Sequence, residues 1–207
     1  MSNYLALATV TASLRTLVSR AIQVVPGAQV STIRPDGLGA GSMVRGVNIF
    51  LYNVTPNLAF ENDDQPMRNS AGVLVQVPCT AVDLHYLFTF YGDEARLEPA
   101  LLLANTLAAI RQQPVLTPSL IAEAISATSH PDLSASDLPA QVPLVSVRHS
   151  PLSFDALTRA WSIFYQVPYI LSAAFEASVV LVDSPVKPTV PPPVQQIVPD
   201  AQPKKRA

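Results

Sequence analysis

One stretch, from Cys79 to Leu116, changes its hydrophobic period midway and therefore predicts a strand followed by a helix. In its first part apolar residues recur at every second position, the spacing of one face of an extended strand, and these are Val82, Leu84, Tyr86, Phe88 and Phe90. The residues between them, which predict the opposite face, include Asp83, His85 and Thr89. After a break at Tyr91-Gly92-Asp93 the apolar residues follow helical spacing, at Leu97, Leu101, Ala104 and Ala108. Pro114 ends this helix because proline cannot continue the helical hydrogen bonds.

The same criteria predict further helices and strands in the rest of the chain up to residue 183. Helices are expected at Tyr4–Val24, Ser119–Thr128 and Ser153–Tyr165. Strands are expected at Val30–Ile33, Val44–Val54, Val73–Val77, Leu144–Arg148 and Tyr169–Val182. The last strand is long for a β-strand, so we expect a bulge or a bend near Ala173-Ala174.

The composition changes at Ser184, where a proline-rich segment begins. The last 24 residues hold seven of the chain's 20 prolines, including Pro191-Pro192-Pro193. Such a sequence excludes helices and paired strands and favours an extended polyproline-type chain. We therefore expect a domain at residues 1–183 and an extended or disordered tail at 184–207. The tail is either an inert end or an arm that docks on a neighbour.

Charge is sparse in this sequence. Hydrophobic residues make up 49% of the chain and charged residues 14%, against about 25% charged in an average protein. This favours a surface that other chains partly cover. The net charge of −2 argues against a general nucleic-acid binder. No run of residues has the basic start of a signal peptide or the length of a membrane-spanning helix, so we expect synthesis in the cytoplasm and no membrane partner.

Few residues offer chemistry. Cys79 is the single cysteine, which excludes an intramolecular disulfide and fits a reducing compartment. Cys79, Asp83 and His85 share one face of the predicted strand, so a thiol hydrolase is one alternative. No activating context surrounds the thiol, and we expect Cys79 to be buried or partly buried. The sequence lacks zinc and serine-hydrolase signatures. We expect no enzyme activity, no metal site and no cofactor.

Four segments together resemble one known family. They are residues 82–94 (VDLHYLFTFYGDE), 101–116 (LLLANTLAAIRQQPVL), 157–164 (LTRAWSIF) and 167–183 (VPYILSAAFEASVVLVD). The sequence resembles the cap, or tail terminator, of extracellular contractile injection systems, which are phage-tail-like particles. The resemblance covers most of residues 5–183. Its most specific parts are Asp83-Leu84-His85-Tyr86-Leu87 with Tyr91-Gly92, Pro114-Val115-Leu116, and Trp161 before Tyr169 and Ser172. The sequence departs from the family at Phe90 and in the proline-rich C-terminus, which has no expected counterpart.

The resemblance implies an α+β fold, with a mixed, mainly antiparallel β-sheet flanked by about four α-helices. It implies a non-enzymatic structural protein that forms a homo-oligomer, expected to be a hexameric ring, on the last layers of an inner tube and a sheath. Such a ring would end polymerisation and hold the sheath extended. Its partners would be the inner tube protein and the sheath protein. The particle that contains it could be released from the cell.

The expected assembly interface is the final predicted strand with the tail. An edge strand can accept an extended arm from a neighbour through main-chain hydrogen bonds. The candidate residues are Glu176, Val180, Val182, Pro185, Lys187, Pro191, Pro192 and Pro193. The alternative is a small adaptor that recruits a partner through its proline-rich tail and remains a monomer.

Overall fold

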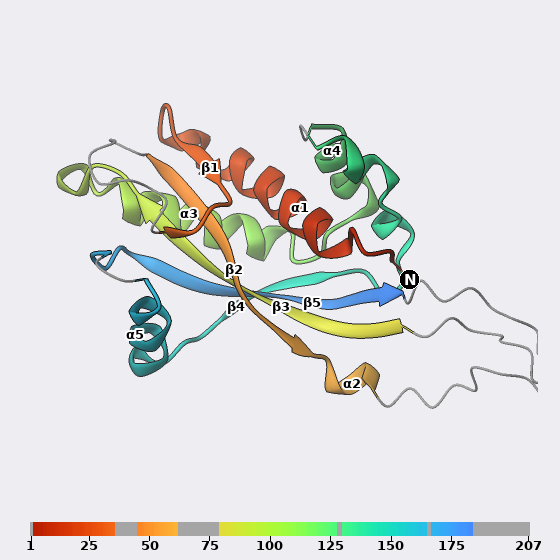
Figure 1. The fold of residues 1–207 in the computed structure, drawn as a ribbon. Helices are drawn as coiled ribbons and strands as arrows, with labels where there is room; N and C mark the ends of the chain where they lie inside the picture. Colours follow the sequence, from red (N-terminus) through yellow and green to blue (C-terminus); the bar gives the residue numbers. More distant parts are fainter. Residues whose placement is uncertain (1, 36–44, 62–78, 128–129, 165–166, 184–207) are drawn as a thin grey trace, which may run out of the picture.

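The structure is a computed structural model, and it describes residues 2–35, 45–61, 79–127, 130–164 and 167–183. Three helices lie on one side of a twisted sheet, and α5 (Phe154–Ser162) lies on the other (Figure 1). The three are α1 (Ala6–Ala21), α3 (Glu98–Gln112) and α4 (Pro118–Ala127). A single turn, α2 (Leu58–Glu61), follows the second strand. No helix in these described ranges has the length and apolarity needed to cross a membrane.

The sheet has five strands in the order β1-β2-β3-β5-β4. They are β1 (Gln29–Ser31), β2 (Gly46–Pro56), β3 (Cys79–Tyr91), β4 (Ser146–Ser150) and β5 (Ser172–Asp183). β1 and β2 are parallel and every other neighbouring pair is antiparallel. The expected mixed, mainly antiparallel sheet with flanking helices is therefore confirmed. The strand predicted at Val73–Val77 lies outside the described residues.

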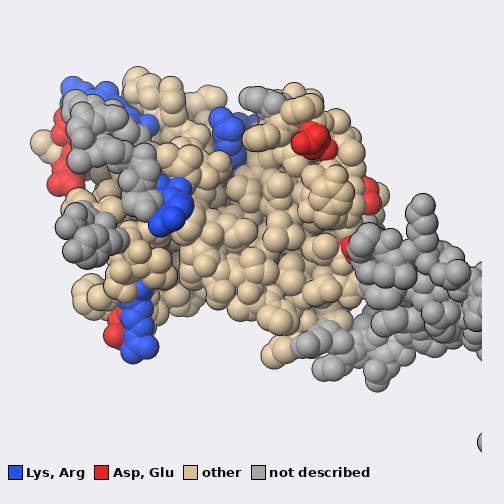
Figure 2. Space-filling model, viewed as in Figure 1, with Lys and Arg blue, Asp and Glu red and all other residues tan. Residues whose placement is uncertain are grey.

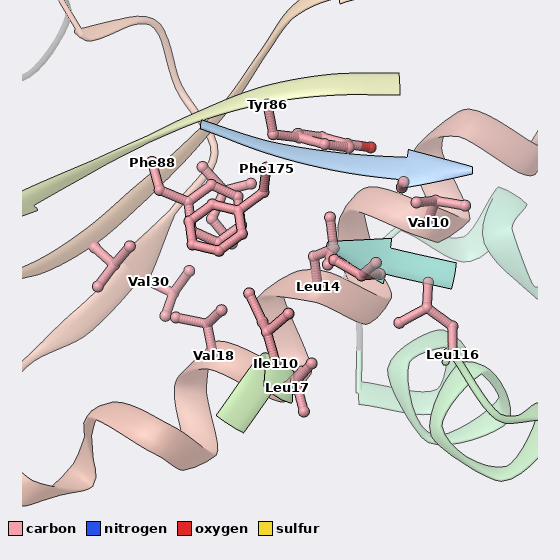
Figure 3. Close-up of a cluster of buried hydrophobic side chains, with 14 of the residues drawn as sticks. Val10, Leu14, Leu17, Val18, Val30, Tyr86, Phe88, Ile110, Leu116 and Phe175 are labelled. Atoms are coloured by element: carbon pink, nitrogen blue, oxygen red, sulfur yellow. The ribbon is translucent and has the colours of Figure 1, made fainter. Parts of the chain in front are cut away.

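The core lies between β3 and the three helices. Leu84, Tyr86, Phe88 and Phe90 are fully buried on the helix side of β3, as their alternation predicted. Figure 3 shows Tyr86, Phe88 and Phe175 facing Leu14 and Val18 of α1. The Tyr86 hydroxyl shares a hydrogen bond of 2.9 Å with Thr11 Oγ1. Burial raises the pKa of Tyr86 above its usual range, so this hydroxyl remains neutral.

A second, smaller cluster holds α5 against the opposite face of the sheet. It consists of Leu87, Trp161 and Phe164, with Phe50 and Leu157 packed around them. The Trp161 and Phe164 ring centroids are 5.8 Å apart in an edge-on arrangement. Trp161 Nε1 also donates to Ser172 Oγ (3.1 Å). Leu157, Trp161 and Phe164 therefore pack together on this face of the sheet, although α5 ends at Ser162, before Phe164.

The bulge in β5 lies elsewhere than the sequence predicts. Leu84 pairs with Ala177, but Val82 pairs with Val180, so β5 contains one extra residue at Ser178-Val179 and not at Ala173-Ala174. The extra residue reverses the alternation. Consequently Val180, and not Val179, enters the core beside Ala177.

Helix α3 is present as predicted, but the apolar residues whose spacing predicted it face solvent and not the core. Leu97 is 68% exposed and Leu101 47% exposed, and Ala104 and Ala108 are exposed as well. The buried positions of the helix include Leu102, Thr106 and Ile110. Both sides of α3 are apolar, so spacing alone predicts the helix and not the side that packs.

The buried side chain of Gln141 bonds to main-chain groups of β5 past the point where β4 ends its pairing. Its loss is predicted to destabilise the fold. The side chain is 1% exposed. Its Oε1 accepts from Leu181 N (3.0 Å) and Ser2 Oγ (3.1 Å), and its Nε2 donates to the carbonyls of Val179 and Pro143 (both 2.9 Å). Gln141→Leu would leave these groups without a partner, so we expect a loss of about 3 kcal/mol in the free energy of unfolding. Urea unfolding measures it.

The matched control for this variant is the exposed Gln112, because Gln112→Leu makes the same change at the end of α3. We expect that control to stay within about 0.5 kcal/mol of the parent. Equal unfolding midpoints for the two variants would contradict the structural role of Gln141.

Candidate assembly interface

The residues predicted for the interface on the final strand lie inside the sheet. β5 pairs with β3 from Ser172 to Asp183, and with β4 from Ala174 to Ser178. Past β4, the Gln141 side chain and Ser2 occupy the same side of β5. From Ala174 to Asp183, β5 is therefore occupied on both edges within the described residues. The length of the strand did not reveal this, because strand order is set by pairing between distant segments.

The individual side chains fit this interior position. Val180 is fully buried in the core, and the partly buried Val182 packs against the same core. Glu176 is buried on the opposite face, beside β4. The remaining predicted residues lie outside the described ones, and these are Pro185, Lys187, Pro191, Pro192 and Pro193.

A polar network surrounds Glu176 on the face opposite the three helices. Glu176 Oε1 accepts from Arg148 Nη2 (2.6 Å), and its Oε2 lies 4.0 Å from His85 Nδ1. His85 Nε2 shares a hydrogen bond of 2.8 Å with Thr55 Oγ1. Burial, followed by the Glu176 charge, raises the pKa of the nearby Tyr52. The network links β2, β3, β5 and β4 side by side.

The structure does not bring Cys79, Asp83 and His85 together as the thiol hydrolase alternative requires. Asp83 accepts hydrogen bonds on both carboxylate oxygens from Asn57 Nδ2 (2.8 and 3.0 Å), which also donates to Ser178 Oγ (3.2 Å). Cys79 and His85 are six residues apart on one extended strand, which is about 20 Å. Cys79 is exposed, so the expected burial of this residue is wrong. Among the described residues, no group of three His, Cys, Asp or Glu could hold a metal ion.

The second strand, and not the final one, has an unpaired stretch of edge among the described residues. β1 pairs with β2 only from Gly46 to Asn48, whereas β2 pairs with β3 as far as Pro56. From Ile49 to Pro56, β2 thus has a strand neighbour on one side only among the described residues. We call residues 49–56 of β2 the open edge. Unpaired main-chain groups on such an edge can bind an extended chain.

Apolar side chains are exposed where the open edge ends. Val54 on the edge is 41% exposed, and Leu58 and Phe60 of α2 are exposed beyond it. Over the face seen in Figure 2, charged side chains lie around the rim and uncharged residues form the middle. These features suit contact with another protein.

A signal for the open edge was present in the sequence. The predicted strands Val30–Ile33 and Val44–Val54 differ greatly in length, so a short first strand beside a long second one leaves part of the longer strand unpaired. Sequence spacing did not reveal which strands are neighbours, and this is why the open edge was missed.

Comparison with known proteins gives a family and a fold. Residues 9–196 match the family described as the Pvc16 N-terminal domain. The match passes the expected domain boundary at residue 183 and includes half of the proline-rich segment, for which no family counterpart was expected. No curated protein matches the chain.

Two solved structures have a similar fold. One is the sheath/tube terminator of an extracellular contractile injection system, PVC, in its extended state, with 15% identity and a TM-score of 0.59. The other is the tube terminating cap of the anti-feeding prophage, with 16% identity and a TM-score of 0.53. They cover 96% and 90% of this chain, and the chain covers 64% and 59% of theirs, about three fifths. The family resemblance and the fold expected from the sequence are confirmed.

Proposed function

The chain belongs to the Pvc16 N-terminal domain family, and we propose from this that it is a structural cap protein of a contractile injection system. In this role it closes the end of the tube and the sheath, ends their polymerisation and keeps the sheath extended. The similar folds of a sheath/tube terminator and a tube terminating cap support the proposal.

The physical requirement for such a protein is one-sided binding. The growing end of a tube or sheath presents unpaired edges and apolar patches that accept the next layer. A terminator binds that surface and presents no equivalent surface on its other side. Copies of the chain arranged as a ring, six in the proposed form, would cover a symmetric end. The charge-poor surface supports such extensive contact.

The observation that carries the proposal is the open edge of β2. An extended arm of a sheath or tube subunit would add to this edge as a further strand, with main-chain hydrogen bonds supplying affinity. The exposed side chains of Val54 and Leu58 would supply apolar contact beside it. No catalytic group is needed for this contact, which is consistent with the proposed non-enzymatic role.

A lysine at the open edge is predicted to weaken this contact. Val54→Lys places a charge on the edge strand, a substitution that discourages strand addition. We expect about ten-fold less of this variant to co-sediment with tube-and-sheath particles, or about 1.4 kcal/mol of binding free energy. The measurement is high-speed sedimentation of particles with quantification of the cap in the pellet.

Val24→Lys makes the same substitution at another exposed valine, which follows α1 and lies away from the open edge. We expect this control to co-sediment like the parent. If both variants sediment normally, the open edge is not the contact. If the parent chain itself stays in the supernatant while particles form, the cap function is wrong.

A further inference from the structure

The side of α3 that faces away from the core exposes a row of apolar side chains. Every exposed residue from Leu97, which precedes the helix, to Ala108 is apolar, and we call these residues the α3 face. They are Leu97, Ala100, Leu101, Ala104, Leu107 and Ala108. Positions 97, 101, 104 and 108 recur at spacings of four and three, which is the spacing of the seam between two packed helices. The α3 face therefore has the pattern of a surface that packs against another helix.

The turn before α3 holds Leu97 outward in a strained conformation. Leu97 has a φ of 56°, in the left-handed region, and is 68% exposed. Such a backbone strains a leucine because its Cβ approaches the following carbonyl oxygen. The buried Glu98 fixes the turn, since its Oε2 accepts from Asp93 N (2.8 Å) and lies 3.2 Å from Arg45 Nε. Strain that presents an exposed apolar side chain indicates a contact outside the single chain.

Opposite charges lie at the two ends of the α3 face. Glu94 lies in the short turn before Leu97, and Arg111 lies in the last turn of α3. Both are exposed, and their side chains make no hydrogen bond or ion pair with any described residue. The 15 residues of α3 span about 22 Å, so the two charges cannot meet within one chain. The α3 face thus has an acidic end and a basic end.

We propose that two copies of this chain pair through the α3 face, with their α3 helices antiparallel about a two-fold axis. A register that places Leu97 of one copy opposite Ala108 of the other also places Leu101 opposite Ala104. Each leucine then meets an alanine, whose small side chain lets the two helices approach closely. Because the axis is two-fold, every contact occurs twice.

The charges at the two ends determine the orientation. Antiparallel helices bring Glu94 of each copy next to Arg111 of the other, so two ion pairs close the ends of the contact. Parallel helices would bring Glu94 next to Glu94 and Leu97 against Leu97, so that like charges and bulky side chains would meet. Opposed helix dipoles also favour the antiparallel arrangement.

This pairing concerns the free chain and goes beyond the proposed capping function. It would cover the α3 face of a cap protein that has not yet joined a particle, where an exposed apolar surface favours aggregation. A two-fold contact uses the same surface on both copies, so pairing stops at two. It does not by itself build the proposed ring.

Sedimentation equilibrium of the full-length chain over a series of concentrations tests the pairing. We expect the parent to show an equilibrium between one and two copies. Leu97→Asn is expected to raise the dissociation constant about a hundred-fold, because two leucines leave the contact. Asparagine tolerates the left-handed backbone better than leucine, so this variant keeps the turn. Leu58→Asn, the same change at an exposed leucine of α2, is the control and is expected to behave like the parent.

A charge reversal tests the antiparallel orientation. Glu94→Lys places two positive charges at each end of the contact and is expected to raise the dissociation constant about ten-fold. Adding Arg111→Glu to the same chain restores opposite charges at both ends only if the helices are antiparallel. We therefore expect the double variant to pair about as tightly as the parent.

Three results would overturn the proposal. They are a parent chain that sediments as one copy up to about 1 mM, equal dissociation constants for Leu97→Asn and Leu58→Asn, and a larger assembly that Leu97→Asn leaves intact. A double charge variant as weak as Glu94→Lys alone would overturn the antiparallel arrangement. No particle is present in these measurements, so their outcome does not depend on the capping function, which co-sedimentation tests separately.

Discussion

Gly46→Ala is expected to unfold β1 from the sheet and to lower the free energy of unfolding by about 4 kcal/mol or more. A Cβ at Gly46 would lie 1.8 Å from the carbonyl oxygen of Gln29 and 2.7 Å from its nitrogen. Both are main-chain atoms, so no side-chain rotation relieves the overlap. The φ of +138° at Gly46 adds strain for any other residue. Urea unfolding followed by the fluorescence of Trp161 measures the loss.

Gly27→Ala is the matched control for this experiment. Gly27 also has a positive φ, +79°, but a Cβ there meets no atom within 4 Å. The control therefore carries the conformational strain without the collision, and we expect it to cost about 1–2 kcal/mol. If Gly46→Ala proved no more damaging than Gly27→Ala, the close approach of β1 to β2 would be wrong.

Phe175→Ala is expected to lower the free energy of unfolding by about 4 kcal/mol, since it removes a large side chain from the middle of the core. Phe175 is fully buried, and its ring centroid lies 4.4 Å from that of Phe88. The substitution would leave a cavity between β5 and α1, and the neighbouring side chains can fill that cavity only in part. Urea unfolding measures this loss: we expect a lower midpoint and an unchanged m-value, the slope of the unfolding free energy against urea concentration.

Phe154→Ala tests whether burial, and not loss of an aromatic ring, causes this effect. Phe154 begins α5 and is 85% exposed. We expect this control to change the free energy of unfolding by no more than about 0.5 kcal/mol. A large loss at Phe154 would mean that this ring packs against another surface under the conditions of the measurement.

Local features of the fold could be predicted because they depend on neighbours in sequence. The alternation from Val82 to Phe90 gave the correct inner face of β3, since side-chain direction in a strand follows the backbone. In β5 the same reasoning failed after Ala177. One extra residue reverses the alternation, and its position depends on the pairing with β3.

The candidate site was harder to predict because it depends on contacts between distant segments. β5 became an inner strand only because residues 146–150 add beside it, and no spacing in its own sequence records that neighbour. The exposure of Leu97 and Leu101 had the same cause, since α3 packs through Leu102 and Ile110 instead. The family resemblance, by contrast, was readable, because it rests on residues and not on their partners.

The unequal lengths of β1 and β2 would also limit how far an added strand can extend along β2. β1 occupies the edge of β2 over three residues, Gly46 to Asn48, and the next eight are open. An arm that pairs with β2 could therefore advance only until it meets β1. The depth of insertion would be limited to about 26 Å. Neighbouring arms of different sequence would then stop at the same height, which would level the rim of the assembly.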